Sequence, residues 1–352
     1  MKLTKLREAL KELGLDALLV TNPYNRRYIT GFTGSSGVAI ISENDAVFIT
    51  DFRYTEQAAD QVKGFKIVQH EKTIIEEVAK QVEAMKISTL GFEKDHVSYG
   101  LYEMYKEKVS AELKAVAGII EKIRLIKTPE EIEVLKHAAK IADDAFTHIC
   151  TFIKPGVTEL EVSNELEMYM RKLGATSSSF DIIVASGERG ALPHGVASDK
   201  VIQSGELVTL DYGALYNGYI SDITRTVAVG EPSEKLKEIY EVTRAAQQLA
   251  LEQIKPGMTG IEADAIARDY IKSKGYDEAF GHSTGHGIGL EVHEGPALSF
   301  RSETVLEPNM AVTVEPGIYL PGIGGVRIED DILITEDGNA RLTHSPKELI
   351  IL

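Results

Sequence analysis

Two periods of hydrophobic residues alternate along the first third of the chain. Three stretches repeat apolar residues at helical spacing, namely residues 3–13, 74–86 and 100–113. Three short runs rich in β-branched residues predict strands, namely residues 16–20, 37–42 and 46–50. Strands that alternate with helices are typical of an α/β domain, which we expect over residues 1–122.

A long amphipathic segment follows this region. Thr128 can cap a helix whose first position is Pro129, and the two glutamates that follow lie at the positive end of the helix dipole. We expect a short lead-in strand before this helix and a domain boundary near residue 122. Residues 123–352 then form a second domain.

The second domain contains an internal repeat. Residues 153–175 align without gaps to residues 254–276, with eight identities in 23 positions that include Ile-Lys-Pro-Gly and a following threonine. The correspondence continues loosely through His194 and His293, and through two strands that each lead to a carboxylate. We therefore expect a duplicated α+β unit with its active site between the halves.

A hairpin fixes the position of two acidic residues in the first half. Asn217-Gly218 between β-prone runs predicts a two-residue type I′ turn. In that register Asp211 lies opposite Thr224, and Asp222 lies one diagonal step away on the same face. The two carboxylates are then close enough to share one ion.

The second half offers a matching pair. Glu315 and Glu329 occupy the corresponding places across a longer turn rich in glycine and proline. If the halves face each other, four acidic side chains converge, and each buried ionised group would cost several kcal/mol. Two divalent cations would cancel the four charges, and oxygen ligands with one imidazole suit Mn²⁺, Co²⁺ or Zn²⁺. Such a two-metal site commonly activates water for hydrolysis.

The segment 281–295, "GHSTGHGIGLEVHEG", supplies imidazoles beside these acids. It holds His282, His286 and His293 among five glycines. A helical zinc motif is excluded, because each glycine would cost a helix roughly 1 kcal/mol relative to alanine. In an extended segment His282 and His286 share one face, and the glycines let a substrate pass close to the backbone.

The composition bears on the possible partners and on the cellular compartment. The formal net charge is -16 and the pI is about 5.1, which argues against nucleic acid as a partner. The one cysteine, Cys150, excludes an intramolecular disulfide and suits the cytoplasm. The charged N-terminus does not resemble a signal peptide, and we expect no membrane span because no run of about eighteen apolar residues occurs.

These residues resemble a known family. The paired repeat and five candidate ligands are similar to the pita-bread metallopeptidases, and the whole chain resembles their Xaa-Pro branch, which includes prolidase and aminopeptidase P. The resemblance implies a creatinase-like N-terminal domain followed by a pita-bread catalytic domain. It also implies a set of metal ligands: Asp211 on one metal, His286 and Glu315 on the other, and Asp222 and Glu329 bridging both.

The resemblance extends to the residues around the ligands. His194 matches a substrate-side histidine, and His282 and His293 match two that contact the substrate or the tetrahedral intermediate. Arg327 matches an arginine that supports the metal-site network. Glu315 is implied to pass a proton to the leaving nitrogen of proline. The other five histidines match nothing in the family.

The function implied is a cytoplasmic metallopeptidase with two divalent metal ions, Mn²⁺ first and Co²⁺ or Zn²⁺ as alternatives. We expect Xaa-Pro dipeptides to be the best substrates, since a compact chain leaves little room for an extended subsite wall; the alternative is aminopeptidase P activity on longer peptides. A methionine aminopeptidase and a non-catalytic binding module of the same fold fit the chain less well. The resemblance further implies a homodimer.

Overall fold

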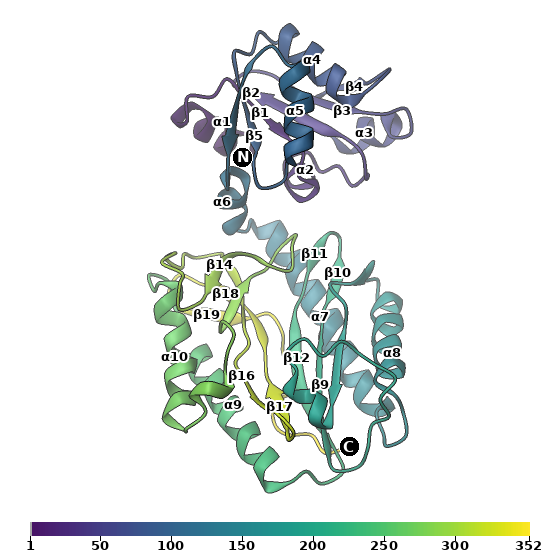
Figure 1. The fold of residues 1–352 in the computed structure, drawn as a ribbon, viewed down its shortest axis with the longest axis vertical. Helices are drawn as coiled ribbons and strands as arrows, with labels where there is room; N and C mark the ends of the chain where they lie inside the picture. Colours follow the sequence, from purple (N-terminus) through teal and green to yellow (C-terminus); the bar gives the residue numbers. More distant parts are fainter. Residues whose placement is uncertain (1) are drawn as a thin grey trace. The chain divides into compact units, whose positions relative to one another are not determined.

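The structure, a computed structural model, describes residues 2–352. The chain divides into two compact units, the first ending at Arg124 and the second beginning at Leu125 (Figure 1). Both units mix helices and strands, and each is described by itself.

The first unit is built on one mixed sheet of order β4-β3-β2-β1-β5-β6. Its strands are β1 Ala17–Val20, β2 Val38–Ser42, β3 Ala46–Thr50, β4 Lys66–Gln69, β5 Thr89–Glu93 and β6 Glu112–Val116. Its helices are α1 Lys2–Glu12, α2 Pro23–Thr30, α3 Thr55–Gln61, α4 Ile74–Ala84, α5 Tyr99–Lys108 and α6 Ile119–Leu125. Strands β1, β2 and β3 pair antiparallel, whereas β1–β5, β5–β6 and β3–β4 pair in parallel.

The six elements predicted in this unit are confirmed, although one helix ends earlier than predicted. The predicted helix over 100–113 ends at Lys108, because Val109 is extended and the chain then enters β6, which pairs with β5. The predicted lead-in strand before residue 128 is absent from the described chain. The helix α6 lies there instead, with Ile119 and Ile120 buried.

The second unit begins with the long helix predicted after Thr128. Thr128 caps α7 Pro129–Phe152 in a capping box with Glu131. The other helices are α8 Glu159–Lys172, η1 Gly187–Ala191, α9 Glu234–Gln253, α10 Gly260–Ser273 and η2 Asp277–Ala279. The strands are β7 Ser177–Ser178, β8 Ile183–Ser186, β9 Glu206–Tyr212, β10 Ala214–Tyr216, β11 Tyr219–Ile220, β12 Ile223–Val229, β13 Gly285–Gly287, β14 Glu294–Leu298, β15 Ala311–Val314, β16 Gly317–Leu320, β17 Gly324–Arg327, β18 Asp330–Ile334 and β19 Asn339–Arg341.

The internal duplication is visible in this unit. We call α7 to β12 the first half and α9 to β19 the second half. Helices α8 and α10 each have 14 residues, and each starts with a capping box, on Thr158 and Thr259 respectively. Apolar residues of α7 and α8 pack on β8, β9 and β12, while those of α9 and α10 pack on β15 to β18 (Figure 1). Each half is therefore a pair of helices covering a sheet.

The hairpin register predicted from Asn217-Gly218 is confirmed. Tyr216 lies opposite Tyr219, and Asp211 lies opposite Thr224. Asn217 and Gly218 have φ values of 48° and 84°, as a type I′ turn requires. The alternation of a β-hairpin thus places both aspartates of the first half where the sequence predicted.

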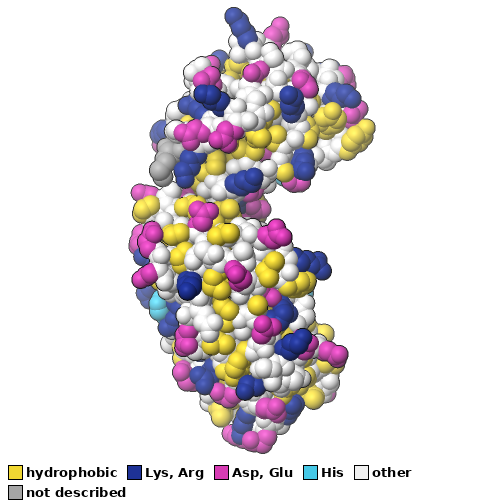
Figure 2. All heavy atoms as spheres, turned by 90° about the vertical axis from the view of Figure 1, so that its left-hand side faces the viewer, with side chains coloured by type: hydrophobic (Ala, Val, Ile, Leu, Met, Phe, Trp, Pro, Cys, Tyr) yellow, Lys and Arg dark blue, Asp and Glu magenta, His cyan; other side chains and the backbone are white. Residues whose placement is uncertain are grey.

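The surface agrees with the acidic composition. On the face shown in Figure 2, Lys and Arg side chains are scattered among Asp and Glu side chains and do not gather into one patch. Within residues 2–352, none of the helices combines the length and the apolar character needed to cross a bilayer.

Candidate metal centre

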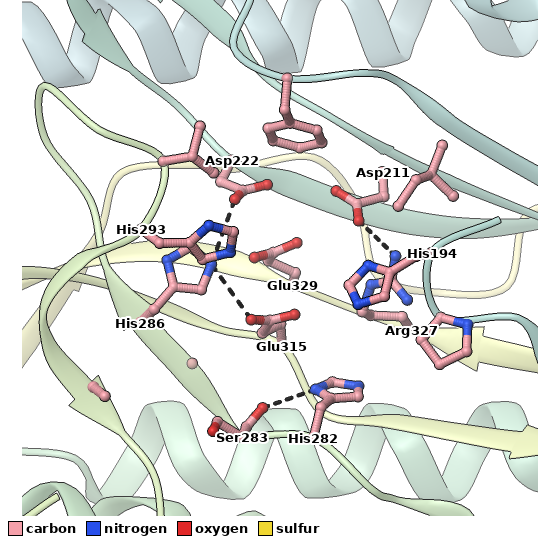
Figure 3. A pocket seen from close by; sticks show the side chains of 16 residues that line it. His194, Asp211, Asp222, His282, Ser283, His286, His293, Glu315, Arg327 and Glu329 are labelled. Carbon is pink, nitrogen blue, oxygen red and sulfur yellow. Dashed lines mark hydrogen bonds and ion pairs between the residues drawn. The ribbon is translucent and has the colours of Figure 1, made fainter. Parts of the chain in front are cut away.

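One cavity in the second unit brings together all of the residues that the sequence singled out (Figure 3). Its volume is about 540 Å³. The predicted residues that line it are His194, Asp211, Asp222, His282, His286, His293, Glu315, Arg327 and Glu329. Apolar side chains, among them Phe180, Ile183 and Pro193, line it as well.

Strand pairing delivers the four carboxylates to this cavity. Val314 pairs with Asp330 in one ladder and Gly317 with Arg327 in the next, so Glu315 and Glu329 lie opposite each other. The Glu329 amide donates to the Thr224 carbonyl oxygen at 3.1 Å, which joins the second half to β12 of the first. The acidic pairs of the two halves therefore meet across a backbone hydrogen bond.

His286 lies among these acids as a neutral imidazole. Its Nε2 is 3.7 Å from Asp222 Oδ2 and 3.5 Å from Glu315 Oε1. Burial, followed by the neighbouring His293, lowers the pKa of His286 to about 4. Its Nδ1 lies 3.1 Å from the Gly287 carbonyl oxygen, which can only accept, so Nδ1 carries the proton. The lone pair on Nε2 is left facing the carboxylates.

Burial and mutual repulsion raise the pKa values of Asp222, Glu315 and Glu329. The pKa of Asp222 is raised well above its usual range by burial and then by Glu329 and Asp211. Burial also raises the pKa of Glu329 well above normal, with Glu315 and Asp211 adding to the shift. The pKa of Glu315 rises to about 8, mainly through burial. Ionising all of these groups at neutral pH requires a compensating positive charge.

Three of the candidate ligands each have a buried carboxylate oxygen that accepts no hydrogen bond from the described residues. These oxygens are Asp211 Oδ1, Asp222 Oδ1 and Glu329 Oε1. Buried acceptors of this kind are rare in folded proteins because leaving one unsatisfied costs about 1–3 kcal/mol. Asp222, His286 and Glu329 each offer a ligand atom within 4.8 Å of the others. The residues therefore fit a divalent cation that prefers oxygen ligands and one imidazole.

Arg327 connects the acids to the rest of the site. Its Nη2 lies 2.5 Å from Asp211 Oδ2, and its Nε donates to Thr224 Oγ1 at 3.2 Å. Thr224 in turn donates to Glu329 Oε2 at 2.6 Å. Asp211 and Glu329 are thus each anchored through one oxygen, and the other oxygen of each is left for a ligand.

Two residues that the sequence pattern did not single out contact the candidate site. The Tyr319 hydroxyl accepts from Arg327 Nη1 at 2.8 Å and lies 2.8 Å from His282 Nε2. Asp331 Oδ2 accepts from the Asp222 amide at 2.9 Å and so holds the backbone of that candidate ligand. Strand alternation could have indicated both residues, because residues an even number of positions apart lie on one face of a strand. Tyr319 lies four residues after Glu315, and Asp331 lies two residues after Glu329.

The three other histidines reach the cavity in different ways (Figure 3). The His293 ring lies 4.4 Å from the His286 ring, measured between centroids. His194 lines the cavity from the loop between η1 and β9. His282 uses both ring nitrogens inside the chain, since Nδ1 lies 2.8 Å from the Ser283 carbonyl oxygen and Nε2 faces Tyr319. Burial lowers the pKa of His282 to about 4, so its ring is also neutral.

The central glycines of 281–295 have a packing role that the sequence did not predict, although Gly285 also lines the cavity. A Cβ on Gly285 would lie 1.9 Å from the Thr313 carbonyl oxygen, and one on Gly287 would lie 2.0 Å from the Gly295 carbonyl oxygen. Thr313 lies in β15 and Gly295 lies in β14, and both strands pair with β13. Glycine is required here because two strands approach the backbone closely.

Comparisons with known proteins agree with this geometry. Residues 133–336 match the model of metallopeptidase family M24, and residues 2–126 match the creatinase/prolidase N-terminal domain. A protein named Xaa-Pro dipeptidase from Pyrococcus furiosus is 46% identical over 99% of both chains. The structure of an Xaa-Pro dipeptidase from Bacillus anthracis has a TM-score of 0.99 and 64% identity, over 100% of this chain and 99% of the other. An X-Pro aminopeptidase from Thermotoga maritima has a TM-score of 0.92 and 42% identity, over 98% and 100%.

Proposed function

Because the chain belongs to metallopeptidase family M24, we propose that it is an exopeptidase that hydrolyses the bond between an N-terminal residue and proline, with Xaa-Pro dipeptides as its best substrates. The observation that carries this proposal is the cluster of buried carboxylates around a neutral imidazole, with three oxygens left for a cation. Relatives named Xaa-Pro dipeptidase at 44–46% identity over almost the whole chain support the substrate class.

We assign two divalent ions to the site, Mn²⁺ first and Co²⁺ or Zn²⁺ as alternatives. Asp211, Asp222, His286, Glu315 and Glu329 would hold these ions, and Asp222 and Glu329 would contribute to both. When bound, such ions lower the pKa of water and polarise the scissile carbonyl group, which is the chemistry that peptide hydrolysis needs. Mn²⁺ is favoured because four of the five side chains offer carboxylate oxygens.

The residues of the chain then hold the substrate and move the proton. Glu315 takes a proton at its carboxylate from the attacking water and gives it to the leaving nitrogen of proline. Phe180, Ile183 and Pro193 offer an apolar wall for the pyrrolidine ring. His194, His282 and His293 face the peptide, and His282 also contacts Tyr319.

The alternative function is that of an Xaa-Pro aminopeptidase, which the similarity to the Thermotoga maritima protein keeps open. A dipeptidase must recognise the proline carboxylate, whereas an aminopeptidase must leave that side open. The deciding measurement is kcat/KM for Ala-Pro, Ala-Pro amide and Ala-Pro-Ala in Mn²⁺, with Pro-Ala as the control peptide. We expect Ala-Pro to be the best substrate. If the amide and tripeptide are cleaved at least about tenfold better, a difference of about 1.4 kcal/mol, the enzyme is an aminopeptidase.

We place the enzyme in the cytoplasm. The single cysteine, Cys150, is half-buried and packs against the apolar core of the first half, so the fold needs no oxidising compartment.

A further inference from the structure

Helix α10 carries a partly buried ion pair, Asp264 with Arg268, which contacts the segment before β13. Arg268 Nε lies 2.6 Å from Asp264 Oδ2, and Arg268 Nη2 lies 2.8 Å from Asp264 Oδ1. The Asp264 side chain is 1% exposed and the Arg268 side chain 22%. Two parallel hydrogen bonds make this a bidentate pair, which fixes the guanidinium plane as well as its distance.

The pair is directed at segment 280–284, which leads into β13. Asp264 Oδ1 accepts from the Thr284 amide at 2.9 Å. Arg268 Nη2 donates to the His282 carbonyl oxygen at 2.7 Å, and its Nη1 donates to the Phe280 carbonyl oxygen at 3.1 Å. Every second residue of the segment is therefore held by one member of the pair.

Two further sets of contacts link the restrained segment 280–284 to residues of the site. The Arg268 guanidinium lies 4.5 Å from the centre of the Phe280 ring, and that ring meets His282 edge to face at 5.0 Å between centroids. The Thr284 carbonyl oxygen accepts from the Glu315 amide at 2.7 Å. One end of the segment thus supports the His282 ring, and the other end supports the backbone of a proposed metal ligand.

The helix itself does not need this pair. Helix α10 already has the Thr259 capping box and buries Ala263, Ala267 and Ile271. An exposed pair at the same i,i+4 spacing stabilises a helix by only about 0.3–0.5 kcal/mol, whereas burying a carboxylate carries a desolvation penalty. Within residues 2–352, the hydrogen bonds that the Asp264 and Arg268 side chains donate or accept outside the helix go to segment 280–284.

In the first half, a buried carboxylate likewise holds the loop that carries His194. Glu159, the first residue of α8, is fully buried and accepts from the amides of Ser186 and Ser198 at 2.8 and 3.1 Å. It also forms an ion pair with Arg189. These residues flank His194. A buried carboxylate paired with arginine therefore anchors a histidine-bearing loop in each half, although the residues used do not correspond in the repeat.

We propose that Asp264 and Arg268 are positioning residues, which hold segment 280–284 so that His282 and Glu315 keep their places in the site. The kinetic consequence rests on the proposed function; the restraint on the segment does not. The competing explanation is that Arg268 merely neutralises a buried aspartate. The two explanations differ in what a lysine at position 268 restores.

The experiment compares Arg268→Gln with Arg268→Lys. Lysine keeps the charge opposite Asp264 but cannot reproduce the planar fork that also reaches the Phe280 and His282 carbonyl groups. Asp144→Asn serves as the matched control, because it removes a carboxylate from the exposed i,i+4 pair that Lys140 and Asp144 form on α7. Each variant is measured for Tm, for kcat and KM on Ala-Pro with Mn²⁺, and for amide exchange of residues 280–284 by mass spectrometry without metal.

We expect Arg268→Lys to recover most of the Tm that Arg268→Gln loses, while kcat stays at least tenfold below wild type and KM changes less than threefold. In both variants the Thr284 amide, which donates to Asp264, should exchange at least tenfold faster, and the control should match wild type. A lysine variant with wild-type kcat and wild-type exchange would overturn the proposal in favour of charge balance. If Arg268→Gln does not fold, the lysine variant alone decides. If wild type cleaves no Xaa-Pro peptide, the proposed function fails, and the exchange data still decide the positioning role.

Discussion

Removing the metal should make the second unit lose stability as the pH rises above neutrality. In the metal-free site, burial raises the pKa of Glu315 from its ordinary 4.5 to about 8. A group whose folded-state pKa is raised contributes stability below its unfolded pKa and loses it as the pH rises through the folded value. For Glu315 the window therefore runs from 4.5 to about 8. Asp222 and Glu329 shift in the same direction.

The size of the effect follows from the shift. With one pKa unit worth about 1.36 kcal/mol, linkage gives a loss of about 1.3 kcal/mol between about pH 7 and about pH 8.5 from Glu315 alone. His282 and His286, with pKa values lowered to about 4, act in the opposite sense, since they lose stability as the pH falls below 6.5. Their contribution above about pH 7 is therefore small. For a unit of this size the Tm should fall by about 2–5 °C.

The assay is thermal unfolding of protein treated with a chelator and of protein loaded with Mn²⁺, at both pH values. Loading displaces protons from the ligands, so the gap in Tm between the two forms should widen as the pH rises. Glu315→Gln is the control, because it removes one of the titrating groups and should make the pH dependence of the metal-free Tm shallower, while Asp222 and Glu329 still titrate. A metal-free Tm that stays level or rises over this range, or that falls equally in Glu315→Gln, would contradict the predicted titration of Glu315.

Four further outcomes are expected. Exhaustive chelation should abolish cleavage of Ala-Pro, and Mn²⁺ or Co²⁺ should restore it; full turnover by protein without metal in elemental analysis would contradict the metal assignment. Asp222→Asn should reduce metal content and lower kcat by orders of magnitude while leaving the fold intact, as circular dichroism would check. Tyr319→Phe leaves Arg327 Nη1 without its acceptor, and we expect kcat to fall about tenfold with metal content unchanged, since an unsatisfied buried donor costs about 1–3 kcal/mol. Static light scattering at micromolar concentration should give the mass of a homodimer, and an active monomer would contradict the dimer prediction.

Turn geometry and strand alternation made part of this site predictable from the sequence. The Asn217-Gly218 turn requires positive φ at both positions, and that requirement sets the register that aligns Asp211 with Thr224. Glu315 and Glu329 follow from the same alternation, because the ladders on either side of them share one register. Where the backbone has few allowed arrangements, a sequence pattern determines which face a side chain occupies.

Contacts between distant segments were not predictable from such rules. The sequence around Asp264 and Arg268 does not predict that segment 280–284 contacts α10. The need for glycine at positions 285 and 287 likewise depends on the positions of β14 and β15. The helix α6 was mistaken for a strand because its apolar pairs fit both periods in so short a segment. In each case, the local structure depends on a segment that only tertiary packing brings into contact.

The site also explains why both halves of the repeat are needed. Asp211 and Asp222 come from the first half, and His286, Glu315 and Glu329 from the second, so neither half alone holds the proposed ligand set. The same strands join the halves, because the Glu329 amide bonds to the Thr224 carbonyl oxygen and Arg327 pairs with Asp211. Repulsion among the acids therefore acts directly on the contact between the halves. A cation that neutralises the acids must stabilise that contact, so metal binding and docking of the halves are one coupled equilibrium.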